Sequence, residues 1–392
     1  MVALGTFAPP FSLVGGYFSL GVLGLIASIF GFYFADFDAI FSFSAAGFLH
    51  LFLLGFVLSI IIGALYQLTS VITQKPFFTL KGAYLILFCY ALALVAFVGG
   101  FFAGNSLLLL FGGGLLFASL CYFGIAYALS FLGLKELNFA CLALLISSIY
   151  LIIGIFLGFA LVLSLNGVLA LSFDFDTVIK LHIYFVLGFM FFVIVGAASV
   201  LLPMFSLAHG LKLYFSKIAM GLYFGAFVGF FIDENIVLLF VILAIFCFVA
   251  EMALIFFKRV RKALDYWNIN IIIAAISVMA CLVCLFFDYT NRALFLFCFG
   301  FLSCFIIAHL YKIVPFLVWY HFVSPFVGKA KVPLLDEMIN KPLAYLQIAF
   351  STVSLILAGF NSFLFSAFLQ LIAASFLAIN ILFIARYVKF KG

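Results

Sequence analysis

Long apolar segments, separated by short polar ones, divide the chain into parts of membrane-spanning length. A helix that crosses the hydrocarbon core of a bilayer needs about 20 apolar residues. Twelve segments meet this requirement: residues 11–34, 41–73, 82–103, 106–133, 138–164, 178–206, 214–232, 236–257, 269–287, 293–320, 343–361 and 363–387. The pattern therefore predicts an all-α polytopic membrane protein with about twelve transmembrane helices.

Composition supports the same class. Hydrophobic residues make up 69% of the 392 residues and charged residues only 8%, whereas soluble domains carry about 25% charged residues. Such a chain has too little polar surface to cover a globule in water, so the lipid bilayer is its expected partner. The net charge of +6 does not indicate nucleic-acid binding, because the basic residues lie between the apolar segments, where they act as topology signals.

Charged residues divide the predicted loops into two groups that alternate along the chain. The loops of one group carry only two basic residues, Lys180 and Arg292. The acidic residues of these loops are Asp36, Asp38, Asp174, Asp176, Asp233, Glu234 and Asp288. The other loops are strongly basic, with a run at Lys258–Lys262 and a long segment at about 321–342. The positive-inside rule predicts that the basic side is cytoplasmic and that both termini lie there.

Three of the predicted helices share a pattern that starts at Gly55, Gly188 and Gly300. Small or polar residues follow each glycine at offsets of 8, 11 and 15 residues, which fall within about 80° of one another on a helix. Such stripes let membrane helices approach closely. The pattern predicts three pseudo-repeats of four helices within a single transmembrane domain, at approximately 1–134, 135–258 and 259–392. Coincidence between packing faces is the alternative.

The five His residues are the main candidates for chemistry. His50 and His182 precede the glycines of their helices and are expected toward the outer side, whereas His309 is expected near mid-membrane. An imidazole in hydrocarbon must be hydrogen-bonded or ligated, and neutral imidazole is a common metal ligand and an axial ligand of haem iron. These three residues are therefore candidate cofactor ligands, with structural hydrogen bonding as the alternative.

Secondary candidates lie nearer the cytoplasmic side. His209 and His321 follow the prolines of their helices and are more typical of interfacial residues. Lys312 and Tyr311 lie within one turn of His309. The long aliphatic side chain of Lys312 could let its amino group reach the cytoplasmic surface, or Lys312 could belong to a proton path. Glu251 has the same two alternatives, a carboxylate that reaches the surface or a member of a proton path.

Twelve helices in three arcs, with His50 near the outer end of the second and His182 early in the sixth, resemble subunit I of the haem-copper oxidase superfamily. The NnrS-type haem and copper membrane proteins are similar as well. The stretch from His50 through Gly55 to Leu68 resembles the low-spin haem helix of that family, and the stretch from His182 to Pro203 resembles the helix that bears the first copper ligand. The resemblance implies haem b at His50, and copper or a second haem bond at His182.

The sequence departs from that family at the oxygen-reducing centre. Five His residues are too few for two haems and a copper ion, and Leu213–Ile232 contains no His. The tenth helix carries Leu294 and Phe295 at the depth of His50. The resemblance therefore implies a haem-binding protein without oxidase activity.

The expected roles of such a protein are electron transfer, response to nitric oxide or other respiratory stress, or handling of haem and copper in a bacterial inner membrane. Respiratory-chain subunits or a quinone are its expected partners. Two alternatives stay open: a transporter of a metal, haem or small solute, with His309 and Lys312 lining the path, and an assembly partner of a respiratory complex.

Overall fold

The computed structural model describes residues 7–37 and 42–391. Asp38, which was assigned to the outer side, lies outside these residues. Within the described residues all regular structure is helical. The chain forms two compact units. Unit 1 contains residues 64–262 together with the residues before Pro10, and unit 2 contains residues 10–63 and 263–392.

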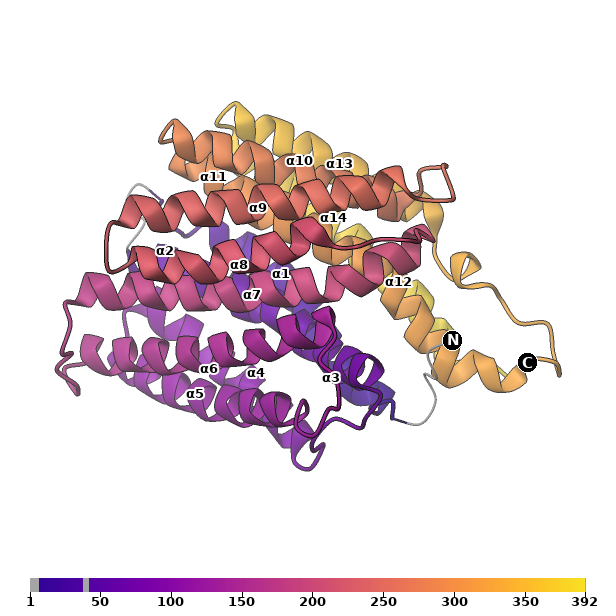
Figure 1. Cartoon of the computed structure of the whole chain (residues 1–392), viewed down its shortest axis with the longest axis horizontal. Coiled ribbons are helices and arrows are strands. Elements are labelled where there is room, and N and C mark those ends of the chain that lie inside the picture. Colours follow the sequence, from indigo (N-terminus) through magenta and orange to yellow (C-terminus); the bar gives the residue numbers. More distant parts are fainter. Residues whose placement is uncertain (1–6, 38–41, 392) are drawn as a thin grey trace. The chain divides into compact units, whose positions relative to one another are not determined.

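Unit 1 consists of three helical hairpins (Figure 1). Their pairs are α4 (Ala83–Ala103) with α5 (Ser106–Leu129), α6 (Phe139–Leu165) with α7 (Phe175–Ser206), and α8 (Tyr214–Gly229) with α9 (Glu234–Phe257). The C-terminal part of α3 (Ser59–Thr73) also belongs to this unit.

Unit 2 combines the first and the last helices of the chain, and α1 packs against α14. Its N-terminal part consists of α1 (Phe11–Phe32), α2 (Phe43–His50), the π-helix η1 (Leu51–Leu58) and the start of α3. Its C-terminal part consists of α10 (Tyr266–Phe286), α11 (Thr290–Phe295), the π-helix η2 (Leu296–Leu302), α12 (Ser303–Val318), the π-helix η3 (Trp319–Val323), the short turns η4 (Ser324–Phe326) and η5 (Leu335–Glu337), α13 (Lys341–Gly359), α14 (Phe363–Ala385) and η6 (Arg386–Lys389).

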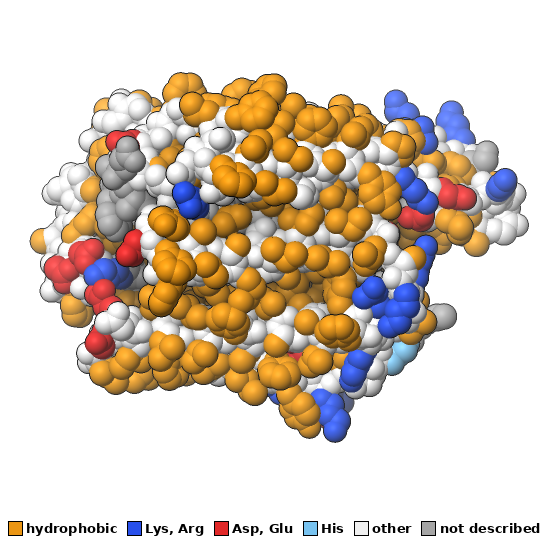
Figure 2. Space-filling view, turned by 90° about the horizontal axis from the view of Figure 1, so that it is seen from above, with side chains coloured by type: hydrophobic (Ala, Val, Ile, Leu, Met, Phe, Trp, Pro, Cys, Tyr) orange, Lys and Arg blue, Asp and Glu red, His pale blue; other side chains and the backbone are white. Residues whose placement is uncertain are grey.

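These helices confirm an all-α polytopic membrane protein. Among the described residues, eleven helical segments are long and apolar enough to cross a membrane. The one remaining predicted span, residues 214–232, corresponds to α8, which has 16 residues. At about 1.5 Å per residue α8 is shorter than the hydrocarbon core of about 30 Å. Apolar side chains cover the flanks of the helices, and charged side chains gather near the helix ends (Figure 2).

Polar residues in the loops explain where many of the helices begin. A side-chain oxygen of each of these N-cap residues accepts a hydrogen bond from a backbone N–H in the first turn. The residues are Ser42, Asn105, Asn138, Asp174, Asp233, Asp265 and Asn340. The same short polar segments that interrupt the apolar pattern therefore also fix the helix starts.

The three glycines of the repeated stripe lie where two helices come close together. A Cβ atom on Gly24 of α1 would lie 2.2 Å from the carbonyl oxygen of Gly55. A Cβ on Gly188 would lie 2.4 Å from the ring of Tyr150, and one on Gly300 would lie 2.5 Å from Ser277. The close approach predicted for the stripe is therefore present on all three helices. The division into three pseudo-repeats stays a prediction.

Two of these glycines lie in π-helical segments that the sequence pattern did not reveal. Gly55 is the fifth residue of η1, and Gly300 is the fifth residue of η2. Gly188 lies in the regular α-helix α7. A π-helical turn inside an α-helix often marks a functional position. His50 is the last residue before η1, so it lies directly at such a turn.

Candidate functional site

His50 is held by its own helix in unit 2. Its Nδ1 lies 2.7 Å from the carbonyl oxygen of Ala46, one turn earlier in α2. A carbonyl oxygen only accepts hydrogen bonds, so Nδ1 is the donor and carries the proton. In the neutral ring the lone pair is then on Nε2. The imidazole is half-buried.

His182 is held by the neighbouring helix in unit 1. Its Nδ1 donates to the carbonyl oxygen of Gly154 on α6, at 2.9 Å. A Cβ atom on Gly158 would lie 2.7 Å from Cε1 of His182, so the missing side chain makes room for the ring. Gly154 and Gly158 form a G-x-x-x-G pattern, which brings membrane helices close together. The sequence alone carries that signal for the position of His182.

His309 is the most deeply buried of the three, at 8% exposure. Its Nδ1 donates to the carbonyl oxygen of Phe305 at 2.7 Å. The Phe305 ring lies 4.5 Å from the imidazole, centre to centre, and the Trp267 ring lies 6.5 Å away. His309 therefore lies among aromatic side chains of α10 and α12 in unit 2.

All three imidazoles thus share one arrangement, in which Nδ1 donates to a backbone carbonyl. This arrangement is common for ligating His residues, because the bond fixes the tautomer and the orientation of the ring. His50 lies in unit 2 and His182 in unit 1. No group of three His, Cys, Asp or Glu residues in the described part of the chain could hold a metal ion. The pairing of His50 with His182 stays a prediction.

The secondary candidates His209, His321 and Tyr311 are either exposed or packed against aromatic rings. His209 is exposed beyond the end of α7. His321 lies in η3 and contacts the rings of Phe11 and Tyr320. Tyr311 packs against Tyr266, with ring centres 5.4 Å apart.

Lys312 and Glu251 both bond to groups at helix ends. The Nζ of Lys312 lies 2.8 Å from Oδ2 of Asp265, the N-cap residue of α10. Burial raises the pKa of Asp265, but the bonds from Lys312 and Asn268 outweigh it, so the net pKa is lowered. Glu251 is 3% exposed, and its Oε2 accepts a hydrogen bond from the backbone N–H of Ser216 in the first turn of α8.

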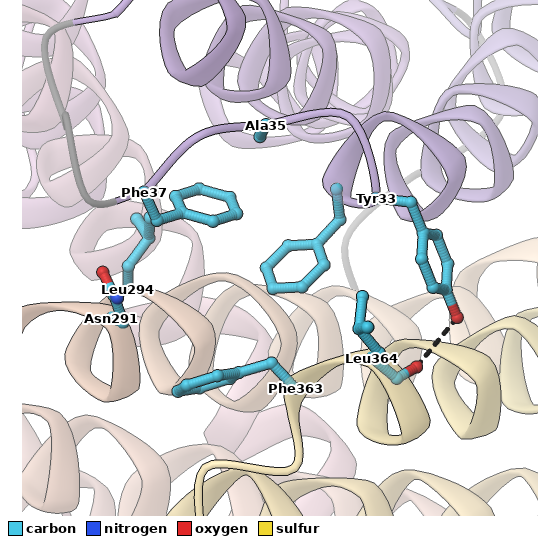
Figure 3. Close-up of a pocket in the computed structure, with 8 residues that line it drawn as sticks. Tyr33, Ala35, Phe37, Asn291, Leu294, Phe363 and Leu364 are labelled. Carbon is cyan, nitrogen blue, oxygen red and sulfur yellow. Dashed lines mark hydrogen bonds between the residues drawn. The ribbon is translucent and has the colours of Figure 1, made fainter.

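A small pocket lies in unit 2, beside the end of α1 and the start of α14 (Figure 3). Its volume is about 150 Å³, and its lining residues are Phe32, Tyr33, Ala35, Phe37, Asn291, Leu294, Phe363 and Leu364. The Tyr33 hydroxyl donates to the carbonyl oxygen of Leu364 at 2.8 Å, which ties the end of α1 to the start of α14. Ligand pockets usually measure about 300–1,000 Å³. This pocket is too small for a haem, and no His lines it.

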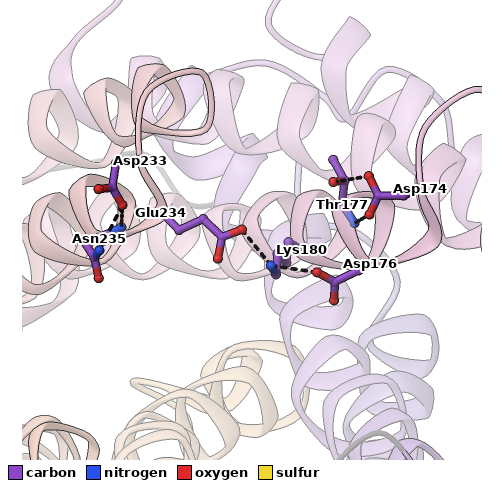
Figure 4. A network of polar contacts seen from close by, with 7 residues as sticks. All are labelled: Asp174, Asp176, Thr177, Lys180, Asp233, Glu234 and Asn235. Carbon is purple, nitrogen blue, oxygen red and sulfur yellow. Dashed lines mark hydrogen bonds and ion pairs between the residues drawn. The ribbon is translucent and has the colours of Figure 1, made fainter.

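A polar network lies at the starts of α7 and α9 in unit 1 (Figure 4). Lys180 pairs with Asp176 at 2.7 Å and with Glu234 at 2.6 Å, which connects the start of α7 to the start of α9. Hydrogen bonds from Thr177 lower the pKa of Asp174. These residues are exposed, and exposed ion pairs stabilise a fold only weakly. The network therefore orients the two helix starts more than it stabilises them.

No model of a known protein family matches the sequence, and no curated protein matches it either.

Proposed function

We propose that the chain is a haem-b-binding membrane protein with His50 and His182 as haem ligands. The observation that supports the proposal most is that both imidazoles carry their proton on Nδ1. Each donates its Nδ1 proton to a backbone carbonyl, and the lone pair of the neutral ring is then on Nε2. An axial haem ligand needs such a lone pair. The carbonyls of Ala46 and Gly154 would hold the rings in place.

Haem in such a protein supplies one-electron chemistry or a site for a diatomic gas. We propose electron transfer, response to nitric oxide or other respiratory stress, or handling of haem and copper. Copper would have His182 as a ligand. The proposal excludes oxygen reduction, because the seventh span, α8, contains no His. The proposed location is a bacterial inner membrane with both termini cytoplasmic, where respiratory-chain subunits or a quinone would be the partners.

Ligand variants test the proposal. The haem content of the purified protein should fall, or its spectrum should change, in His50→Ala and in His182→Ala. His209→Ala is the matched control, because His209 is exposed beyond the end of α7. The control should keep its haem, and all three variants should reach the membrane at wild-type level. Unchanged spectra in both ligand variants would exclude these two residues as ligands.

A transporter is the second candidate, and it is supported by the polar groups near His309. The Lys312–Asp265 ion pair and the buried His309 are connected through neighbouring turns of α12. A path for a metal ion, haem or small solute along α12 would use these groups. Flux of a solute into proteoliposomes, lost in His309→Phe, would favour this function. The role of an assembly partner is tested by co-purification of respiratory subunits.

A further inference from the structure

Buried polar side chains line the inner faces of α13 and α14 in unit 2. On α13 they are Gln347, Ser351 and Ser354, which are 0–1% exposed and share one helix face. On α14 they include Gln370, at 5% exposure. Most of these groups bond to one another. The Ser351 hydroxyl lies 3.4 Å from the Gln370 amide, and the Ser354 hydroxyl donates to the carbonyl oxygen of Ser366 at 2.7 Å. Such bonds hold membrane helices together.

The pair Asn270 and Gln347 differs from this pattern. Nδ2 of Asn270 donates to the carbonyl oxygen of Tyr266 at 3.0 Å and to Oε1 of Gln347 at 3.3 Å. Oδ1 of Asn270 and Nε2 of Gln347 have no hydrogen-bond partner among the described residues. Both side chains are 0% exposed. The pair therefore presents one acceptor and one donor that the protein does not satisfy.

Rotating either amide does not remove the problem. With the Asn270 amide reversed, its oxygen would face the carbonyl oxygen of Tyr266. With the Gln347 amide reversed, its NH₂ group would face the NH₂ group of Asn270. Both arrangements place like groups together, so the orientation described above is the better one. An unpaired polar group in a medium without water is costly.

We infer that a water molecule bound between Asn270 and Gln347 satisfies both atoms. The water would accept from Nε2 of Gln347 and donate to Oδ1 of Asn270, two of the bonds that a buried water usually makes. The residue that bonds to Asn270, Tyr266, reaches toward the surface of unit 2 at its other end. Its hydroxyl donates to Oδ1 of Asp336 at 2.9 Å, and the side chain of Asp336 is 48% exposed.

Hydroxyl-radical footprinting of the full-length protein in detergent tests this site, because radiolysis of a bound water labels the side chains beside it. Tyr266, whose backbone carbonyl accepts from Asn270, should be labelled, although it is 2% exposed. Tyr127 is the control, since it is 0% exposed and its hydroxyl lies 3.0 Å from that of Ser147. Labelling of Tyr266 several-fold above that of Tyr127 supports the inference. Equal labelling of the two overturns it.

Substitution of the pair gives a second, independent measurement. The double variant Asn270→Leu/Gln347→Met removes both atoms and should abolish the excess labelling of Tyr266. Gln370→Met is the control variant and should keep it. A hydrated pair is satisfied, so the double variant should have the wild-type Tm or a lower one. Without a bound water, the two unsatisfied atoms would destabilise the folded protein, and their removal would raise the Tm. A rise in Tm would therefore overturn the inference.

Discussion

His182 donates its Nδ1 proton to the carbonyl oxygen of Gly154, 2.9 Å away on α6. The neighbouring glycine of the same helix face, Gly158, has no side chain, and a Cβ there would lie 2.7 Å from the imidazole. One helix thus supplies both the hydrogen-bond acceptor and the space for the ring. This relationship makes the position of His182 a property of the α6–α7 hairpin.

The first prediction concerns that space. Gly158→Ala should displace the His182 ring and cost about 1–3 kcal/mol of stability through overpacking. If His182 binds haem, the same change should alter the haem spectrum. Gly99→Ala in α4 is the control, because nothing lies within 4 Å of a Cβ built there. Absorbance spectra and thermal unfolding of the two purified variants provide the measurement. Identical behaviour of both would mean that the ring is not confined by Gly158.

The second prediction concerns His309. Its Nδ1 bonds to a carbonyl of its own helix, and that carbonyl keeps its backbone partner after substitution. His309→Phe should therefore reach the membrane at a level close to wild type while it loses the redox, proton-transfer or transport step that His309 serves. Membrane level and the functional assay are compared with those of His309→Gln. Misfolding of the Phe variant, with both folding and function restored by Gln, would identify a purely structural role.

The third prediction concerns the ion pair between Lys312 and Asp265. Asp265→Asn keeps an oxygen for the cap on Asn268 but removes the charge opposite Lys312. The loss should cost about 1.5–3 kcal/mol, the usual range for a hydrogen bond to a charged group. Lys312→Met in the same background gives the double-mutant cycle. Additive effects of the two changes would show that the pair contributes no coupling.

The same pair predicts a dependence on pH. The pKa of Asp265 is lowered in the folded protein, so its contribution is present above the unfolded pKa of about 3.9 and is lost as pH falls through the folded value. The Tm of the wild type should therefore approach that of Asp265→Asn as the pH is lowered below about 4. A gap in Tm that stays constant down to pH 3 would contradict this assignment.

The helices were predictable because each apolar segment has a length that the bilayer requires, and the ends follow from caps such as Asn138 and Asp174. The π-helical turns at Gly55 and Gly300 were not, because a change in backbone hydrogen bonding leaves no period in the sequence. The partners of Lys312 and Tyr266 were also hidden, since Asp265 and Asp336 reach them only after folding. For His182, the G-x-x-x-G pattern at Gly154 was the missed signal.

Orientation in the membrane gives a further prediction. Single cysteines placed at Asp174 and at Lys329, in a background without the native cysteines, should react with an impermeant thiol reagent from opposite sides. Position 174 should react in intact cells, and position 329 only after the membrane is opened. The reason is that the loops containing Lys258–Lys262 and Lys329 are rich in basic residues, which the positive-inside rule places in the cytoplasm. Labelling of position 329 in intact cells would reverse the orientation, and with it the outer placement of His50.

The central proposal is that the chain binds haem b, and one measurement addresses it directly. The wild-type protein is purified from haem-replete cells, and its reduced-minus-oxidised absorbance spectrum is recorded together with its iron and copper content. The account predicts the bands of a b-type haem and iron in proportion to protein. A colourless protein without iron would contradict the account and would favour the transporter in its place.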